Sequence, residues 1–228
     1  MATSDEAAYT APDTHIYADT TTTRSGWLTG GGTTGNERLT TTAGATLLIL
    51  LVALGVTIIR IGGLLSEHLF IGMLLVPPVL LKMASTGYRF ARYYTANPAY
   101  RRKGPPELAL RALAPMVVLS TVVVFASGVA LLFAGPSSRS TLFPIHKLSF
   151  FAWLAFMALH VLGHLPGMPA VLRADYGRSA GISSDVTGRA GRMLALGGAL
   201  VAGVVLAVLV IPEFGPWVHN AGIFHHHH

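Results

Sequence analysis

Four nitrogen-bearing side chains interrupt two apolar stretches of this sequence at a repeated spacing. His68 and Lys82 lie in one stretch, His146 and His160 lie in another, and the members of each pair are 14 positions apart. Fourteen residues make about four turns of an α-helix, so each pair lies on one helix face, roughly 21 Å apart along its axis. Ionisable residues inside a membrane span are costly and mark a functional site by default. Histidines that face one another in a helix bundle are suited to ligating haem iron.

The composition is typical of a membrane protein. Hydrophobic residues make up 52% of the 228 positions and charged residues only 11%, with a mean hydropathy of +0.56, whereas soluble domains carry about a quarter charged residues. There is no cysteine, which excludes disulfides, thiolate ligands, Cys-ligated iron–sulfur clusters and a thiol nucleophile. The net charge of +6 does not indicate a nucleic-acid partner, because the basic residues cluster beside apolar spans, where they meet anionic lipid headgroups.

Five apolar spans are each long enough for the ~20 residues that a transmembrane helix needs. They predict an all-α fold, an integral membrane helical bundle with five transmembrane helices. The first four, over residues 43–167, form the candidate haem-binding core. The approximate bounds of the spans are 43–63, 67–94, 110–134, 143–167 and 192–212.

The segments outside these spans are polar. Residues 1–42 are rich in threonine and glycine and bury too little apolar surface to fold alone, so a partner could order them. Residues 168–191 form a basic loop, and residues 213–228 form an outer tail. The final four histidines of that tail resemble the remains of a purification tag, and we exclude them from the site.

The distribution of lysine and arginine predicts the orientation. Most basic residues follow the second and fourth spans, so the positive-inside rule places the N-terminus in the cytoplasm and the C-terminus outside, in a bacterial-type cell membrane. The second and fourth spans then both run inward from the outer face. His68 and His146 therefore share an outer depth, and Lys82 and His160 share a deeper one.

A low-spin haem takes two axial ligands from opposite sides, and His68 and His146 meet that requirement at matched depth. The alternative is that both are interfacial histidines in contact with water. Arg60 and Arg139, near the outer end, could bind haem propionates through charge-assisted hydrogen bonds or serve only as interfacial anchors. Small residues that would let a macrocycle approach the backbone are Gly55, Gly62, Gly63 and Gly128.

This pattern is similar to the core of cytochrome b in quinol-oxidising complexes, in which two helices each carry two histidines about 14 residues apart that ligate two stacked haems. Related bacterial cytochromes b share the four-helix architecture. The resemblance covers about residues 43–167 and implies that His68 and His146 ligate the outer haem, with His160 as one ligand of an inner haem. Lys82 stands where the family has its fourth histidine, so the second ligand of an inner haem is left open.

Lys82 has three interpretations. It could ligate an inner haem as a neutral amine, pair as a cation with a haem propionate or a quinone oxygen, or snorkel and bind backbone carbonyls. His160 and His164 are one turn apart, which suits a haem ligand beside a quinone-binding or proton-relay residue. The same spacing suits a zinc pair, although no acidic residue accompanies it on that span. Met83 could supply a thioether ligand or simply pack.

These features favour a haem-b-binding membrane electron-transfer protein, with one haem expected, a second left open, and quinone as a further candidate ligand. It would pass electrons between the quinone pool and a redox partner protein or a larger membrane complex, as a subunit of an oxidoreductase rather than a stand-alone enzyme. Alternatively it could reduce a small acceptor, such as ferric iron or superoxide, at the outer face. The rival hypothesis is a non-redox accessory subunit, or a small proton-coupled transporter that uses Lys82, His160 and His164.

Overall fold

The computed structural model describes residues 32–95, 97–98, 101, 108–176 and 188–221. Over these residues the secondary structure is helical, with no β-strand, as the apolar spans predict. The elements are α1 (Gly32–Ile59), α2 (Leu65–Tyr94), α4 (Leu108–Ala134), η1 (Pro136–Ser138), α5 (Arg139–His164), α6 (Met168–Tyr176), α7 (Arg189–Leu209), η4 (Ile211–Phe214) and α8 (Gly215–Ala221).

Five of these helices, α1, α2, α4, α5 and α7, are long and apolar enough to cross a membrane. Their surfaces carry large apolar side chains that would be unfavourable in water. Ile59, Leu148 and Leu209, for example, are 84%, 72% and 71% exposed. A hydrocarbon environment removes the hydrophobic penalty for such exposure. The predicted all-α membrane bundle with five spanning helices is therefore confirmed.

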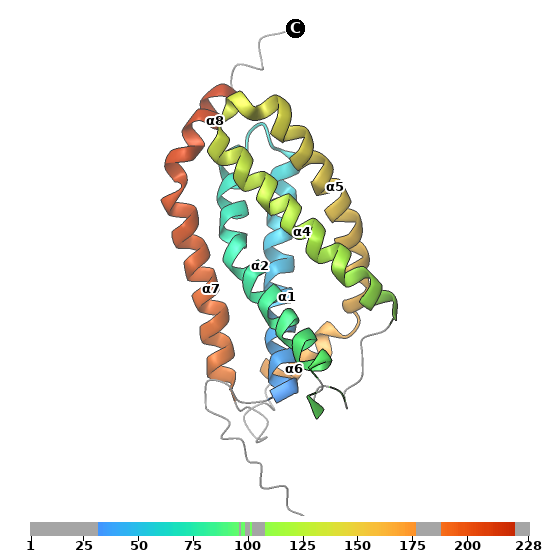
Figure 1. Ribbon diagram of the computed structural model, residues 1–228. Coiled ribbons are helices and arrows are strands. Elements are labelled where there is room, and N and C mark those ends of the chain that lie inside the picture. Colours follow the sequence, from blue (N-terminus) through green and yellow to red (C-terminus); the bar gives the residue numbers. More distant parts are fainter. Residues whose placement is uncertain (1–31, 96, 99–100, 102–107, 177–187, 222–228) are drawn as a thin grey trace, which may run out of the picture.

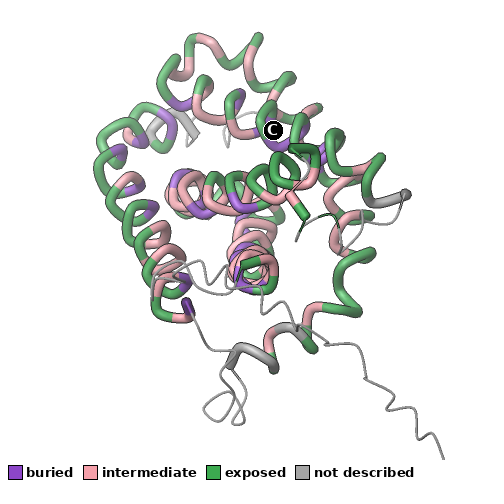
Figure 2. Tube along the Cα trace, turned by 60° about the horizontal axis from the view of Figure 1, so that its bottom comes forward, coloured by how far each residue is buried: buried purple, intermediate pink, exposed green. Residues whose placement is uncertain are grey.

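The long helices run along one axis of the molecule and pack in two groups (Figure 1). Helix α2 packs against both α1 and α7, and α4 packs against α5. Buried positions lie mainly on the helix faces that are turned toward a neighbouring helix, and exposed positions on the outward faces (Figure 2). Among the described residues, α2 and α5 are not a closely packed pair. The two helices that carry the candidate ligands therefore interact through side chains rather than by close backbone packing.

Helix α7 lies outside the predicted four-helix core and is anchored to α2 by a glycine. A Cβ at Gly203 would collide with the carbonyl oxygen of Leu74 in α2. Small residues at such points let the backbones of two membrane helices approach closely. Gly197 and Gly198, on the same helix, have open space around them instead. The backbones of α7 and α2 therefore approach each other closely at Gly203.

Helix α1 begins at Gly32, well before the apolar span predicted from residue 43. The polar residues of this extension have hydrogen-bond partners on α2. The Asn36 side-chain amide donates to the carbonyl oxygen of Ser85 at 3.1 Å, and the hydroxyls of Thr40 and Ser85 are 3.0 Å apart. Because these groups are satisfied between helices, the helix continues into sequence that has no apolar periodicity. Residues 1–31 of the predicted N-terminal segment lie outside the described residues.

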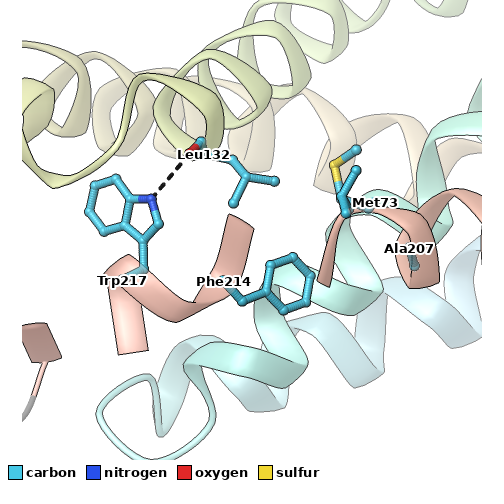
Figure 3. Close-up of a cluster of buried hydrophobic side chains, with 6 residues drawn as sticks. Met73, Leu132, Ala207, Phe214 and Trp217 are labelled. Atoms are coloured by element: carbon cyan, nitrogen blue, oxygen red, sulfur yellow. Dashed lines mark hydrogen bonds between the residues drawn. The ribbon is translucent and has the colours of Figure 1, made fainter. Parts of the chain in front are cut away.

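The C-terminal elements lie across one end of the bundle (Figure 1), and Figure 3 shows the side-chain cluster that they complete. Beyond α7, the short helices η4 and α8 bring Phe214 and Trp217 into a buried cluster with Met73 of α2 and Leu132 of α4. The indole Nε1–H of Trp217 donates a hydrogen bond to the carbonyl oxygen of Leu132 at 3.3 Å. This cluster links α7 to both α2 and α4 at the end of the bundle where α5 begins.

Candidate functional site

The four sequence-predicted nitrogen ligands lie on two of the long helices. His68 and Lys82 lie on α2, and His146 and His160 lie on α5. His68 is close enough to His146 for the two rings to interact electrostatically, and His160 interacts with Lys82 in the same way. We call His68 and His146 the outer pair, and Lys82 and His160 the inner pair. The repeated 14-residue spacing on both helices therefore brings His68 near His146 and Lys82 near His160.

The ring of His68 is fixed by α1. Thr57 Oγ1 lies 3.1 Å from His68 Nδ1 and 2.6 Å from the carbonyl oxygen of Leu54. Because the Thr57 hydroxyl donates its single hydrogen to that carbonyl, its oxygen accepts a hydrogen bond from His68 Nδ1–H. His68 therefore keeps its lone pair on Nε2, which is the nitrogen left to bind a metal.

The ring of His146 is fixed by α4 through the same arrangement. Ser127 Oγ lies 3.1 Å from His146 Nδ1 and 3.1 Å from the carbonyl oxygen of Val124. When the hydroxyl hydrogen is directed at that carbonyl, His146 Nδ1–H is the donor and Nε2 keeps the lone pair. Ser149 adds a second hydroxyl, 3.2 Å from Ser127 Oγ, and donates to the carbonyl oxygen of His146 at 2.9 Å.

A glycine lets the His146 ring lie against α4. A Cβ at Gly128 would come within 3.0 Å of His146 Cε1 and 3.4 Å of Nδ1. The sequence marked Gly128 as a place for a macrocycle to approach, but here it makes room for the imidazole. At the other three candidate glycines, Gly55, Gly62 and Gly63, an added Cβ would have nothing within 4 Å, so they do not restrict any described neighbour.

The donor set of the outer pair fits a six-coordinate haem. The iron of a haem takes four nitrogens from its macrocycle, so it needs only two from the protein. The described residues contain no group of three or more His, Cys, Asp or Glu side chains that could hold a free metal ion. A zinc site built on His160 and His164 therefore has no third ligand of these types among them. Hydrogen bonds from Nδ1 to fixed acceptors are the usual way in which metal-binding histidines are oriented.

The inner pair has different surroundings. Lys82 Nζ donates to the carbonyl oxygen of Thr40 on α1 at 3.0 Å, and the α1 residue that faces Nζ is Gly44, where a Cβ would lie 3.0 Å away. Of the three interpretations of Lys82, this geometry agrees with binding to a backbone carbonyl. Ser85, one turn further along α2, donates to the carbonyl oxygen of Lys82 at 3.0 Å and fixes the local helix against Thr40.

His160, on α5, lacks a hydrogen-bond partner on one nitrogen. Its Nδ1 is buried and forms no hydrogen bond in the described structure. The ring of His164, which is exposed in the last turn of α5, lies 4.6 Å away between centroids. Buried polar atoms are nearly always hydrogen-bonded, so an orphaned imidazole nitrogen indicates a missing partner.

The two predicted propionate-binding arginines lie at the end of the bundle where α1 ends and α5 begins. Arg60 follows α1 and is exposed, and Arg139 opens α5 with its guanidinium 5.3 Å from the centroid of the Phe143 ring. Exposure at a helix end agrees with the interfacial-anchor interpretation of both residues. Met83, beside Lys82 on α2, is half-buried.

The hydroxyls that orient the rings were missed in the sequence. Thr57 and Ser127 are both buried, and each lies on the helix that precedes the histidine-bearing helix. In the sequence, each appears only as a hydroxyl residue inside an apolar span. That is weak evidence for a role in the site, because such residues often bond only to their own helix, as Ser120 does to the carbonyl oxygen of Val117. Pairing a hydroxyl with an imidazole requires the rotation of both helices to be known.

Comparison of the chain with protein-family models, with curated proteins and with solved structures gives no match. Over the described residues, the chain forms a bundle with five helices long and apolar enough to cross a membrane, and two of these helices bring His68 and His146 near each other.

Proposed function

We propose that this chain is a haem-b-binding membrane electron-transfer protein, with His68 and His146 as the axial ligands of one haem. The observation that supports it best is the matched state of the two rings. Each donates from Nδ1 to a hydroxyl whose own hydrogen is engaged, and each keeps the lone pair of Nε2 for a ligand. Two interfacial histidines without a ligand would not need this common arrangement.

A bound haem supplies one-electron chemistry between ferric and ferrous iron, and the protein supplies position and environment. Thr57 and Ser127 hold the two rings in fixed tautomers, and Gly128 gives the His146 ring its place beside α4. Arg60 and Arg139 lie at the outer end, where their charges would favour binding of the propionates.

The electron donor or acceptor in this proposal is the quinone pool, and the other partner is a redox protein or a larger membrane complex. The described residues form a helical bundle with no separate domain for a soluble substrate, which supports a role as an electron-transfer subunit. Basic residues such as Arg89, Arg92 and Arg111 lie where α2 ends and α4 begins, at the end of the bundle opposite Arg60 and Arg139. The positive-inside rule then places this end, and the N-terminus with it, in the cytoplasm of a bacterial-type cell. The C-terminus lies outside.

The absorption spectrum of the purified protein tests the proposal. We expect an intense Soret band, a sharp α band after reduction with dithionite, and one haem b per chain in a pyridine haemochrome assay. His68→Ala should remove the haem, whereas His164→Ala, which changes an exposed histidine of α5, should keep it. A folded, monodisperse preparation that stays colourless after incubation with haem would refute the proposal.

A proton-coupled transporter remains a second candidate because Lys82 and His160 are ionisable residues on the spanning helices α2 and α5. In that case, replacing either residue would abolish proton-dependent uptake in proteoliposomes, and the protein would bind no haem. An accessory, non-redox subunit would tolerate both replacements. The haem assay together with the uptake assay therefore separates all three functions.

A further inference from the structure

A groove of about 670 Å³ lies at the end of the bundle where α2 begins. One of its walls is the start of α2, with Ser66, Glu67, Phe70 and Ile71, and the other is formed by η4 and α8. Neither the outer pair nor the inner pair lines it, so it is distinct from the candidate haem site. Its volume lies within the ~300–1,000 Å³ of small-molecule sites in proteins.

The walls of this groove are apolar and are held in place by the bundle core. Phe214 of η4 belongs to the buried cluster that joins α2, α4 and α7, and Phe70 packs against the same cluster (Figure 3). Ile211 and Val218 also line the groove but are 47% and 40% exposed, so it presents apolar surface to its surroundings. A fixed apolar groove binds an apolar chain with little cost of reorganisation.

Glu67 gives the groove one charged end. It is the only ionisable side chain among the residues that line the groove. The carboxylate is exposed, and no basic side chain in the described part of the chain forms an ion pair with it. Its negative charge therefore favours a ligand with a cationic group.

The order of these groups along α2 matches the polarity of a lipid. Glu67 lies in the first turn of this spanning helix, and Phe70 and Ile71 lie about one turn further into it. Because α2 has 30 residues and only ~20 are needed to cross the hydrocarbon core, its first turn lies among the lipid headgroups. A molecule with its head at Glu67 and an apolar chain along the groove therefore lies parallel to the lipids of this leaflet.

We propose that this groove binds a membrane phospholipid with a primary ammonium in its head group, a phosphatidylethanolamine. The Glu67 carboxylate accepts a charge-assisted hydrogen bond from the ammonium, and one acyl chain lies between Phe70 of α2 and Val218 of α8. A quaternary ammonium has no N–H to donate, and an anionic head group would be repelled by Glu67. The bound lipid joins α8 to the start of α2, and its site does not depend on haem.

Titration of the detergent-purified protein with lipids of identical acyl chains, followed by native mass spectrometry, tests the proposal. We expect phosphatidylethanolamine to bind more tightly than phosphatidylcholine or phosphatidylglycerol, because only its head group carries a cationic N–H donor. Glu67→Gln should raise the Kd of phosphatidylethanolamine roughly three- to tenfold and remove this preference. The matched control is Glu213→Gln, which changes an exposed acid of η4 that does not line the groove and should leave Kd unchanged.

Filling the groove tests its apolar part without a change of charge, and covers the case in which Glu67→Gln does not fold. Val218→Trp places an indole in the groove and should weaken binding of the first phosphatidylethanolamine. Val208→Trp is the control, because Val208 is a similarly exposed residue of α7 outside the groove.

Three results would overturn the proposal. The first is a preference for phosphatidylethanolamine that persists in Glu67→Gln or is lost equally in Glu213→Gln. The second is unchanged lipid binding in Val218→Trp. The third is a dimer of the wild-type protein that Val218→Trp dissociates, because the groove would then hold a second copy of the chain. A protein that shows the expected lipid binding but contains no haem would refute only the proposed electron-transfer function.

Discussion

The outer and inner pairs are built from the same helices with the same spacing, yet they offer different atoms to a ligand. At the outer level, Thr57 and Ser127 accept hydrogen bonds from the two imidazoles and leave two Nε2 lone pairs for a ligand. At the inner level, a carbonyl oxygen accepts from Lys82, and His160 Nδ1 has no hydrogen-bond partner among the described residues. Helical periodicity brings residues together, but the hydrogen-bond partners from neighbouring helices decide what they bind.

Each level also uses one glycine of the preceding helix to seat its side chain. Gly128 on α4 lies against the His146 ring, and Gly44 on α1 lies against Lys82 Nζ. In both cases a Cβ would come within 3.0 Å of the functional group. The two levels can therefore be perturbed separately, by changes that leave the ligand residues in place.

The largest expected difference between the levels follows from removing one imidazole of α5 at a time. His146→Ala should reduce haem content from one per chain to nearly none, because six-coordinate haem iron loses an axial ligand. His160→Ala, on the same helix, should leave haem content unchanged. The measurement is the haem-to-protein ratio after saturation with haem.

Added imidazole controls for misfolding in this experiment. It should enter the space left in His146→Ala and restore the Soret band, which a misfolded variant would not allow. Loss of haem in His160→Ala with retention in His146→Ala would move the haem site to the inner level.

A second prediction converts the inner level into the outer one. Lys82→His places an imidazole near His160, with the Thr40 carbonyl oxygen available to accept its N–H. We expect haem content to rise above one per chain, although not fully to two, because His160 Nδ1 lacks the acceptor that orients the outer rings. Pyridine haemochrome assays at increasing haem concentration measure the gain. A Lys82→His protein that still binds a single haem would show that residue 82 alone does not distinguish the levels.

Much of this arrangement could be predicted from sequence, because it depends on one-dimensional patterns. Apolar spans of sufficient length indicated the five helices. The direction assigned to the second and fourth spans from their flanking basic residues predicted that His68 would share a level with His146 and Lys82 with His160. The start of α1 at Gly32 could not be predicted, since its polar residues are stabilised by Ser85 on another helix.

Two features could not be predicted from sequence patterns. One depends on how neighbouring helices are rotated about their axes, and the other on how the C-terminal segment turns back onto the bundle. The partnership of Thr57 with His68 depends on how α1 is rotated against α2, and no pattern within either span records that rotation. The return of η4 and α8 over the bundle end, with Trp217 bonded to Leu132, lies in a tail for which no motif indicated a role. The ligand roles of the histidines themselves stay predictions until the haem assays are made.

A third prediction addresses the hydroxyls that orient the outer rings. Thr57→Val and Ser127→Ala should each weaken haem affinity by roughly 10- to 100-fold, the usual cost of losing a partner of a metal-binding histidine. Ser120→Ala is the matched control, because Ser120 is a buried serine of α4 that donates to a carbonyl of its own helix. Haem transfer to apomyoglobin measures the relative affinities. Equal affinities in Ser127→Ala and Ser120→Ala would show that the Nδ1 hydrogen bond is not needed.

The smallest expected effects come from the two glycines, and they separate the levels most cleanly. Gly128→Ala requires the His146 ring to shift by a few tenths of an ångström, so haem affinity should fall only several-fold. Gly44→Ala should leave haem affinity unchanged, because its Cβ displaces Lys82 Nζ and touches neither outer imidazole. Gly72→Ala, on α2 between the levels with nothing within 4 Å of its Cβ, is the control for both. An equal loss of haem affinity in Gly44→Ala and Gly128→Ala would mean that the two levels form one site, since a local displacement at one could not otherwise reach the other.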